Sequence, residues 1–162
     1  MTWAELLANK TVTALAPSKA ELDNLRSIVA RSLKDVTASG LSADARFIMA
    51  YDAARTLSLI VVRAAGYRPR TVGGHYNTFL ALEAVDPAFA GVSAYFDGCR
   101  FKRNASEYDV AGGITDTDAD GLLQAAHQFA VDAEGGSKPT IRSWPKTRDR
   151  RVADGLLKAL PT

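Results

Sequence analysis

The sequence predicts an all-α fold, an antiparallel helical bundle of four to five main helices with a short C-terminal helix. Apolar residues recur at helical spacing over most of the chain, Gly and Pro interrupt them at intervals suited to short loops, and no run alternates convincingly as a strand. The 162 residues are enough for one domain that buries its core without disulfides. We expect residues 1–137 to form the bundle and residues 138–162 to form a basic arm and short helix packed on it.

The first two main helices begin at serine caps. Ser18 and Glu21 have the spacing of a capping box, and apolar positions then recur at helical period until Gly40. Ser42 can cap the next helix, whose apolar face continues to the neighbourhood of Gly66. The breadth of that face predicts the central helix of the bundle.

Gly and Pro delimit the remaining helices. The stretch "GYRPRTVGG" predicts a connection, because Pro69 disfavours a helical residue before it, and "HYNTFLALEAV" then resumes helical spacing. Pro87 can open a fourth helix at its first turn, and this helix ends at the break around Gly112. The fifth helix runs from "TDTDADG" to Gly135.

The net charge of +2 conceals an uneven distribution. Residues 109–137 hold six acids and no Lys or Arg, whereas residues 138–162 hold seven bases and two acids. Either the two segments lie against each other, or the basic arm meets an anionic partner such as nucleic acid. Trp144 in this arm either anchors it to the bundle or stacks on a nucleobase. The lone Cys99 and the lack of a long apolar run predict a cytoplasmic protein with no membrane partner.

The stretch "GCRFKRNASEYD" concentrates polar chemistry on one predicted helix. Arg100, Asn104 and Tyr108 follow one another at i, i+4 and i+8, beside the i, i+4 pair of Arg103 and Glu107. One interpretation is a solvated face with a weak surface ion pair. The other is a phosphate site, because a carboxamide beside two guanidinium groups suits phosphate and sugar oxygens.

This stretch also resembles a known superfamily. "RNASEYD" resembles the signature helix of HEPN domains, "GYRPRTVGGHYNTFLAL" resembles the link and helix that precede it, and together the likeness covers residues 42–132. HEPN proteins are small helical bundles, commonly dimers, and many are metal-independent endoribonucleases of toxin or phage-defence systems. Their motif is an arginine, a polar residue and, after a short interval, a histidine. The resemblance implies Arg103 and Asn104 for the first two, and Tyr108 stands where the histidine is expected.

Because Tyr108 replaces the histidine of the motif, an imidazole would have to come from another part of the chain. Metal-free cleavage of RNA needs a base for the 2′-hydroxyl, and histidine does such work near neutral pH far better than tyrosine does. His75 lies on the segment that in HEPN-like proteins approaches the signature helix. Either it joins Arg103 and Tyr108, within one chain or across a dimer, or it bonds local backbone at the start of a helix. Arg68 and Arg70 would extend the phosphate-facing surface.

The function implied by the resemblance is RNA binding with metal-independent endoribonuclease activity of a toxin or defence type. The expected catalytic and phosphate-binding residues are Arg103, Asn104, Tyr108 and His75, with Arg100, Arg68 and Arg70 on phosphate. No cofactor or metal is expected, and the expected partners are a second copy of the chain, RNA or nucleotide, and a cognate antitoxin or nucleotidyltransferase. One alternative is a catalytically inactive HEPN-like binding or regulatory module that partners a nucleotidyltransferase. Another is an interaction bundle whose polar stripe lines a dimer interface.

The segment "DTDADGLLQAAH" imitates the beginning of a calcium-binding loop. His127 stands where such a loop needs its closing glutamate, and the preceding "AGGI" is not helical in pattern. A helix start capped by Thr115 or Thr117, with acids in its first turn, explains the same residues without a metal ion.

Overall fold

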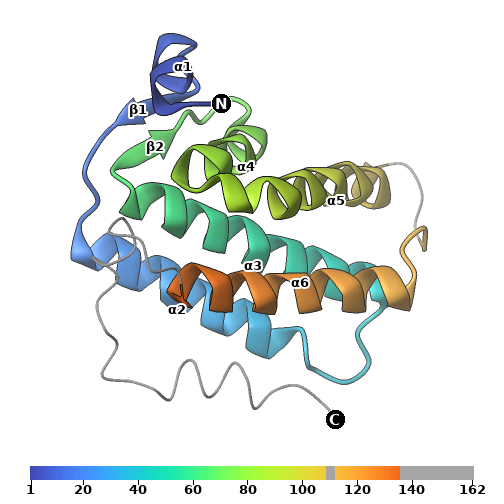
Figure 1. Cartoon of the computed structure of the whole chain (residues 1–162). Coiled ribbons are helices and arrows are strands. Elements are labelled where there is room, and N and C mark those ends of the chain that lie inside the picture. The colour runs from blue at the N-terminus through green and yellow to red at the C-terminus, as the bar shows by residue number, and fades with distance from the viewer. Residues whose placement is uncertain (109–111, 136–162) are drawn as a thin grey trace.

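A computed structural model of the chain describes residues 1–108 and 112–135 (Figure 1). The described part is a helical bundle with one small sheet, which confirms the predicted all-α class. Its elements, in chain order, are α1 (Trp3–Ala8), β1 (Val12–Ala14), α2 (Lys19–Asp35), α3 (Ala43–Ala64), β2 (Tyr67–Pro69), α4 (Gly74–Val85), the 3₁₀ turn η1 (Pro87–Phe89), α5 (Ala90–Tyr108) and α6 (Asp116–Gly135).

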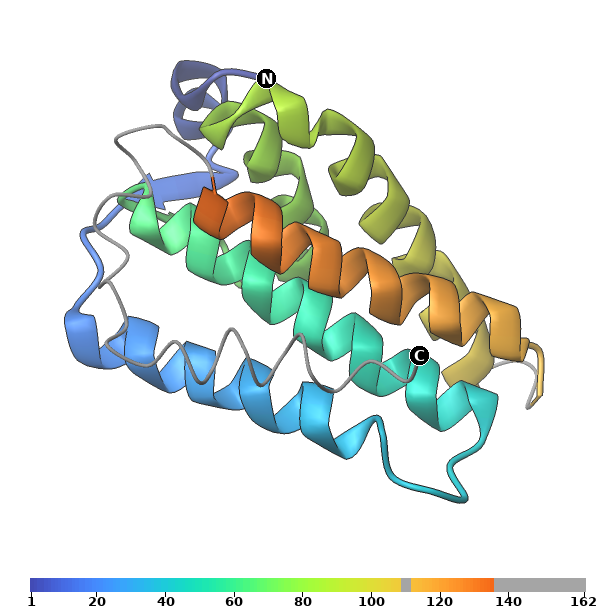
Figure 2. The same cartoon turned by 60° about the horizontal axis from the view of Figure 1, so that its bottom comes forward.

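Helix α3 is the central helix, as its broad apolar face predicted. It is in contact with α2, α4, α5 and α6, and Figures 1 and 2 show those helices around it. The neighbouring α2 runs antiparallel to α3 after a short connection, whereas α6 runs in the same direction as α3. The starts of α3 and α6 are therefore close, and Arg46 of α3 pairs there with both Asp116, at 2.6 Å, and Asp120.

The helix starts follow the caps that the sequence indicates, with one difference. Ser18 caps α2 by accepting a hydrogen bond from the Glu21 amide at 3.1 Å, but the Glu21 carboxylate turns away to Arg63, so the predicted capping box is only half formed. At α6, Thr115 accepts from the Asp118 amide at 3.0 Å and its own amide donates to the Asp118 carboxylate at 3.1 Å. The acidic segment is thus a capped helix start, and no cluster of His, Cys, Asp or Glu in the described residues could hold a metal ion.

A small antiparallel sheet corrects the prediction that the chain has no strands. Strands β1 and β2 pair with Val12 opposite Pro69 and Ala14 opposite Tyr67, and the Trp3 ring stacks on Tyr67 with centroids 3.8 Å apart. The stretch predicted as a plain connection before α4 therefore contains a strand. Each strand has only three residues, which is too short for alternation to show in the sequence.

Arg63, near the end of α3, is buried and holds the N-terminal segment to the bundle. Its guanidinium donates to the two carboxylate oxygens of Glu21 at 2.7 and 3.0 Å. It also donates to the backbone carbonyls of Leu15 at 2.6 Å, Tyr67 at 3.1 Å and Ala16 at 3.3 Å. We call this arrangement the Arg63 clamp. It joins α2, the residues directly after β1, and strand β2 to the central helix.

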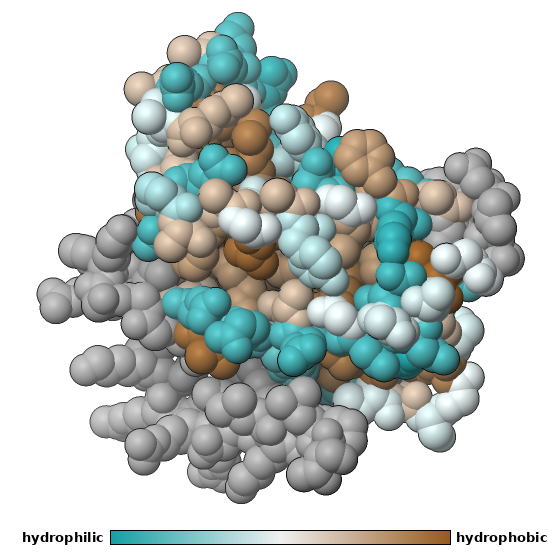
Figure 3. Space-filling model, turned by 45° about the vertical axis from the view of Figure 1, so that its right-hand side comes forward, coloured by the Kyte–Doolittle hydropathy of each residue, from teal (hydrophilic) through white to brown (hydrophobic). Residues whose placement is uncertain are grey.

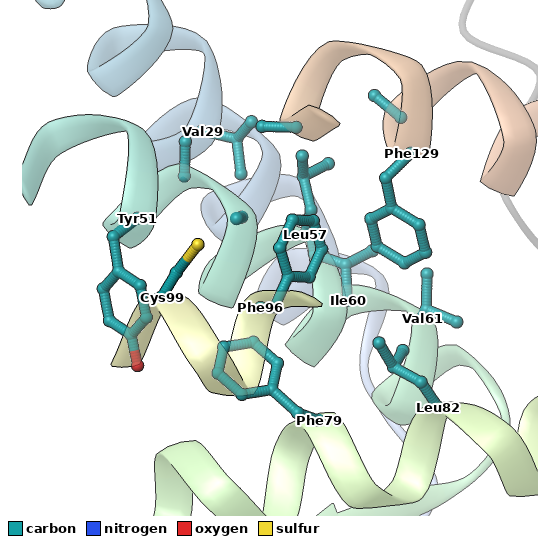
Figure 4. Packing of buried hydrophobic residues seen from close by; sticks show 14 of the residues in the cluster. Val29, Tyr51, Leu57, Ile60, Val61, Phe79, Leu82, Phe96, Cys99 and Phe129 are labelled. Carbon is teal, nitrogen blue, oxygen red and sulfur yellow. The ribbon is translucent and has the colours of Figure 1, made fainter. Parts of the chain in front are cut away.

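A series of aromatic rings crosses the core beside α3. Tyr51 meets Phe79 of α4 edge-on at 6.0 Å between centroids, Phe79 meets Phe96 of α5 at 5.8 Å, and Phe96 meets Phe129 of α6 at 5.6 Å. Figure 4 shows these rings among the aliphatic side chains of α3, with Tyr51 at the edge of the group. Cys99 is buried beside them.

The predictions for the basic arm, its terminal helix and Trp144 lie outside the described residues. Within residues 1–108 and 112–135, no helix has the length and apolar character that crossing a membrane requires.

Candidate functional site

The polar residues predicted on one helix take different positions on α5. Arg100 and Arg103 are only partly exposed and approach aromatic rings of neighbouring helices, whereas Asn104 is exposed to solvent. Tyr108 is the last residue of α5, and its side chain lies outside the part of the chain that the structure describes. The described members of the predicted stripe are thus two arginines directed toward α3 and α4, and one exposed carboxamide.

His75 is held by a residue far away in the sequence. It is the second residue of α4, which begins after Gly73 in a left-handed conformation with φ +70°. The Nδ1 atom of His75 lies 3.1 Å from the hydroxyl oxygen of Tyr51, at hydrogen-bond distance. The alternative in which this imidazole bonds local backbone is therefore not what the structure shows.

Tyr51 is where His75 and Arg103 meet. The Arg103 guanidinium carbon lies 5.4 Å from the centroid of the Tyr51 ring, and the Tyr51 hydroxyl reaches His75. Arg55 lies one helical turn after Tyr51 on α3 and is partly buried. We call Tyr51, Arg55, His75, Arg100 and Arg103 the His75 cluster. The cluster draws on α3, α4 and α5 and joins the segments that the sequence singled out separately.

The electrostatics of the cluster keep His75 neutral. Burial lowers the pKa of His75 below its usual value, and the positive charges of Arg55 and Arg103 lower it further. Arg100 acts in the same direction, and only Asp52 opposes them. Burial raises the pKa of the Tyr51 hydroxyl to about 12, although the same arginines oppose that rise. At neutral pH the cluster therefore presents an uncharged imidazole, a protonated phenol and three guanidinium groups.

This combination suits an anionic ligand that exchanges a proton. In one tautomer the Tyr51 hydroxyl donates to Nδ1 of His75 and Nε2 carries the proton; in the other, Nδ1–H donates to the hydroxyl and the Nε2 lone pair is a base. The arginines supply fixed positive charge that no accessible pH removes. Phosphate is the common biological group that such charges bind most readily.

The other two predicted phosphate contacts, Arg68 and Arg70, are both exposed. Arg70 lies just before α4, and its backbone carbonyl accepts a hydrogen bond from the Asn77 side chain at 3.5 Å. Arg68 instead lies near enough to Glu21 to lower the pKa of that carboxyl, after the larger effects of Arg63. Arg68 therefore lies near the Arg63 clamp.

Sequence reasoning missed Tyr51, Arg55 and Asp52. The spacing of Tyr51 places it on the apolar face of α3, and its hydroxyl leaves no mark on helical periodicity. Arg55 carried a usable signal: it is an arginine in the middle of a mainly apolar run, one turn after a tyrosine. A charged side chain at such a position requires a compensating environment, and this marks it as a candidate site residue.

The lowered pKa values of the two histidines predict how the stability of the protein depends on pH. Burial lowers the pKa of His127 in α6, as it does for His75. Unfolded histidines bind a proton near about pH 6.5, and the folded protein binds it only at lower pH, so acidification favours unfolding in that interval. We expect the urea concentration at the unfolding midpoint to decrease as the pH is lowered from about 7.5 to about 5.5. Exposed carboxylates stay ionised over this interval. His127→Gln should flatten that decline, and an unchanged slope in this variant would contradict the prediction.

Comparisons with known proteins identify no family for this chain. No family model matches the sequence, and no curated protein or solved structure matches it either. A functional proposal therefore rests on the geometry of the His75 cluster and on the resemblance of residues 103–109 to the HEPN signature helix.

Proposed function

We propose that this protein is an HEPN-like, metal-independent endoribonuclease that binds RNA at the His75 cluster. The observation that carries the proposal is the neutral imidazole of His75, fixed by the Tyr51 hydroxyl and surrounded by the charges of Arg55, Arg100 and Arg103. Cleavage by the RNA 2′-hydroxyl requires a base, a hydrogen bond that orients the base, and positively charged groups that bind the phosphate.

Each group has a role in the proposed reaction. His75 takes the proton of the 2′-hydroxyl, whose oxygen attacks the adjacent phosphorus. Arg103 and Arg100 stabilise the additional negative charge on the phosphoryl oxygens, and Asn104 orients the sugar-phosphate backbone. Tyr108, at the position of the family histidine, donates a proton to the departing 5′-oxygen. The bond from phosphorus to that oxygen breaks, which leaves a 2′,3′-cyclic phosphate and a 5′-hydroxyl end.

Cleavage of RNA in the presence of EDTA tests this proposal. We expect the purified protein to cleave RNA and to leave cyclic phosphate ends, and we expect a substrate with 2′-deoxyribose at the cleaved position to resist. Arg103→Ala should lower the rate about 10- to 100-fold, because Arg55 and Arg100 still contribute charge. Arg31→Ala, a change at an exposed arginine of α2, is the matched control and should leave the rate unchanged.

The same experiment separates the proposal from a non-cleaving module. The specific observation that favours such a module is Tyr108 itself, since it replaces the histidine of the family motif. Intact RNA after incubation, with binding that weakens strongly as salt rises and that Arg100→Ala reduces, would identify a binding or regulatory protein instead. A homodimer and an antitoxin or nucleotidyltransferase partner belong to the proposal in both versions.

A further inference from the structure

Two exposed aromatic rings lie close to one arginine of the His75 cluster. The guanidinium carbon of Arg100 lies 4.4 Å from the centroid of the Phe101 ring and 5.6 Å from that of Tyr76. Phe101 is 62% exposed and Tyr76 is 45% exposed. Asp97 holds the guanidinium in place, because its carboxylate accepts a hydrogen bond from Nε of Arg100 at 2.7 Å. We call Tyr76 and Phe101 the aromatic pair.

The aromatic pair is next to the proposed phosphate site. Tyr76 follows His75 on α4 and Phe101 follows Arg100 on α5. The charge of Arg100 acts on both His75 and Tyr51, so this one guanidinium connects the rings to the cluster. A ligand with alternating anionic and flat apolar groups would therefore meet arginine charge and aromatic surface in succession. A single-stranded nucleic acid has this alternation.

The cavity on the other side of α5 is a weaker candidate for such a ligand. It has a volume of about 290 Å³ and is lined by Tyr95, Gly98, Cys99 and Lys102, among others. Gly98 and Lys102 each lie two positions from Arg100, so helical geometry turns them away from it. On the face shown in Figure 3, brown and pale brown surface crosses the middle of the molecule above a band of hydrophilic residues. The aromatic pair is distinguished by its direct contact with a cluster arginine.

We propose that Tyr76 and Phe101 stack a nucleobase next to the phosphate bound by the His75 cluster, so that the substrate is single-stranded. This inference rests on the proposed function, because it assigns the RNA's base to a place beside the phosphate. A base inside a duplex already stacks on its neighbours and cannot reach the rings. The π-faces of all four bases are suited to such contacts, so the pair selects for strand state rather than for sequence.

An abasic oligonucleotide tests stacking apart from charge. We would measure binding of the full chain to a short, labelled, single-stranded oligodeoxynucleotide, which lacks the 2′-hydroxyl and cannot be cleaved, and to its abasic counterpart with the same phosphates. The wild-type protein should bind the intact strand about tenfold more tightly, in line with the usual contribution of one stacked base. Phe101→Leu should remove most of this preference while leaving binding of the abasic strand unchanged.

Two further variants control for general damage. Tyr95→Leu removes another exposed ring of α5, one that lines the cavity, and should keep the wild-type preference. Tyr76→Leu should behave like Phe101→Leu. An equal affinity for the two strands in the wild type, no detectable binding, or an unchanged preference in Phe101→Leu would overturn the inference. If the protein prefers the intact strand but does not cleave RNA, the proposed ribonuclease activity is wrong and the stacking surface stands. If it cleaves RNA but shows no preference for the intact strand, the stacking surface is wrong and the proposed activity stands.

Discussion

Replacing Arg63 with leucine is expected to lower the free energy of unfolding by about 2–4 kcal/mol, somewhat less than the usual cost of breaking a fully buried ion pair, because the Glu21 side chain is 32% exposed. Arg63 is 2% exposed, and its guanidinium satisfies Glu21 and three backbone carbonyls. Leucine has no donor, so the half-buried Glu21 carboxylate and the three backbone carbonyls would lose this partner together. Urea unfolding followed by circular dichroism measures the change.

Two further variants separate the clamp from a general effect of losing an arginine. Arg31→Leu, at an exposed position of α2, should change stability by no more than about 0.5 kcal/mol. Glu21→Leu combined with Arg63→Leu should recover part of the loss, because no uncompensated carboxylate remains. A loss below about 1 kcal/mol for Arg63→Leu would show that the clamp does not hold the fold together.

Replacing His75 with alanine is expected to reduce RNA cleavage about 10²- to 10⁴-fold, the range that a positioned acid–base group commonly contributes. The pH dependence of the rate gives a second readout. Since burial and the nearby arginines lower the pKa of His75, the wild-type rate should rise with pH and level off at a lower pH than it would with an ordinary histidine as the base. Single-turnover cleavage across this pH range measures both effects.

Tyr51→Phe distinguishes a base from a residue that positions it. The phenylalanine keeps the ring in the core and removes the hydroxyl that meets Nδ1 of His75. We expect a smaller loss of rate than for His75→Ala, with unchanged affinity for a non-cleavable oligonucleotide. A His75→Ala protein that cleaves RNA at the wild-type rate would exclude His75 as the base, whatever the behaviour of Tyr51→Phe.

The helices could be predicted because their signals are local. Ser18, Ser42 and Pro87 mark starts through contacts within one turn, and the structure places α2, α3 and η1 at these positions. The breadth of the apolar face of α3 also predicted its central position, since periodicity reports which sides of a helix are buried. Information of this kind is contained in neighbouring residues.

The site and the clamp depend on partners that are distant in sequence. Glu21 has capping-box spacing, yet its carboxylate binds Arg63 on another helix, and no local pattern distinguishes the two outcomes. The Tyr51 hydroxyl likewise meets His75, 24 positions later in the chain. The sequence singled out Arg100, Arg103 and His75 as candidates, but only the packing of α3 against α4 and α5 shows which groups of the described residues meet.

The place of Tyr51 at the edge of the aromatic core has a consequence for motion. Its ring packs edge-on against Phe79, and its hydroxyl fixes the imidazole of His75. Turning that imidazole away requires the loss of a hydrogen bond to a fully buried ring, so the orientation should be held more firmly than that of a surface histidine. Amide hydrogen exchange around residues 51 and 79 should accordingly proceed only through global unfolding, with protection close to the full stability of the domain.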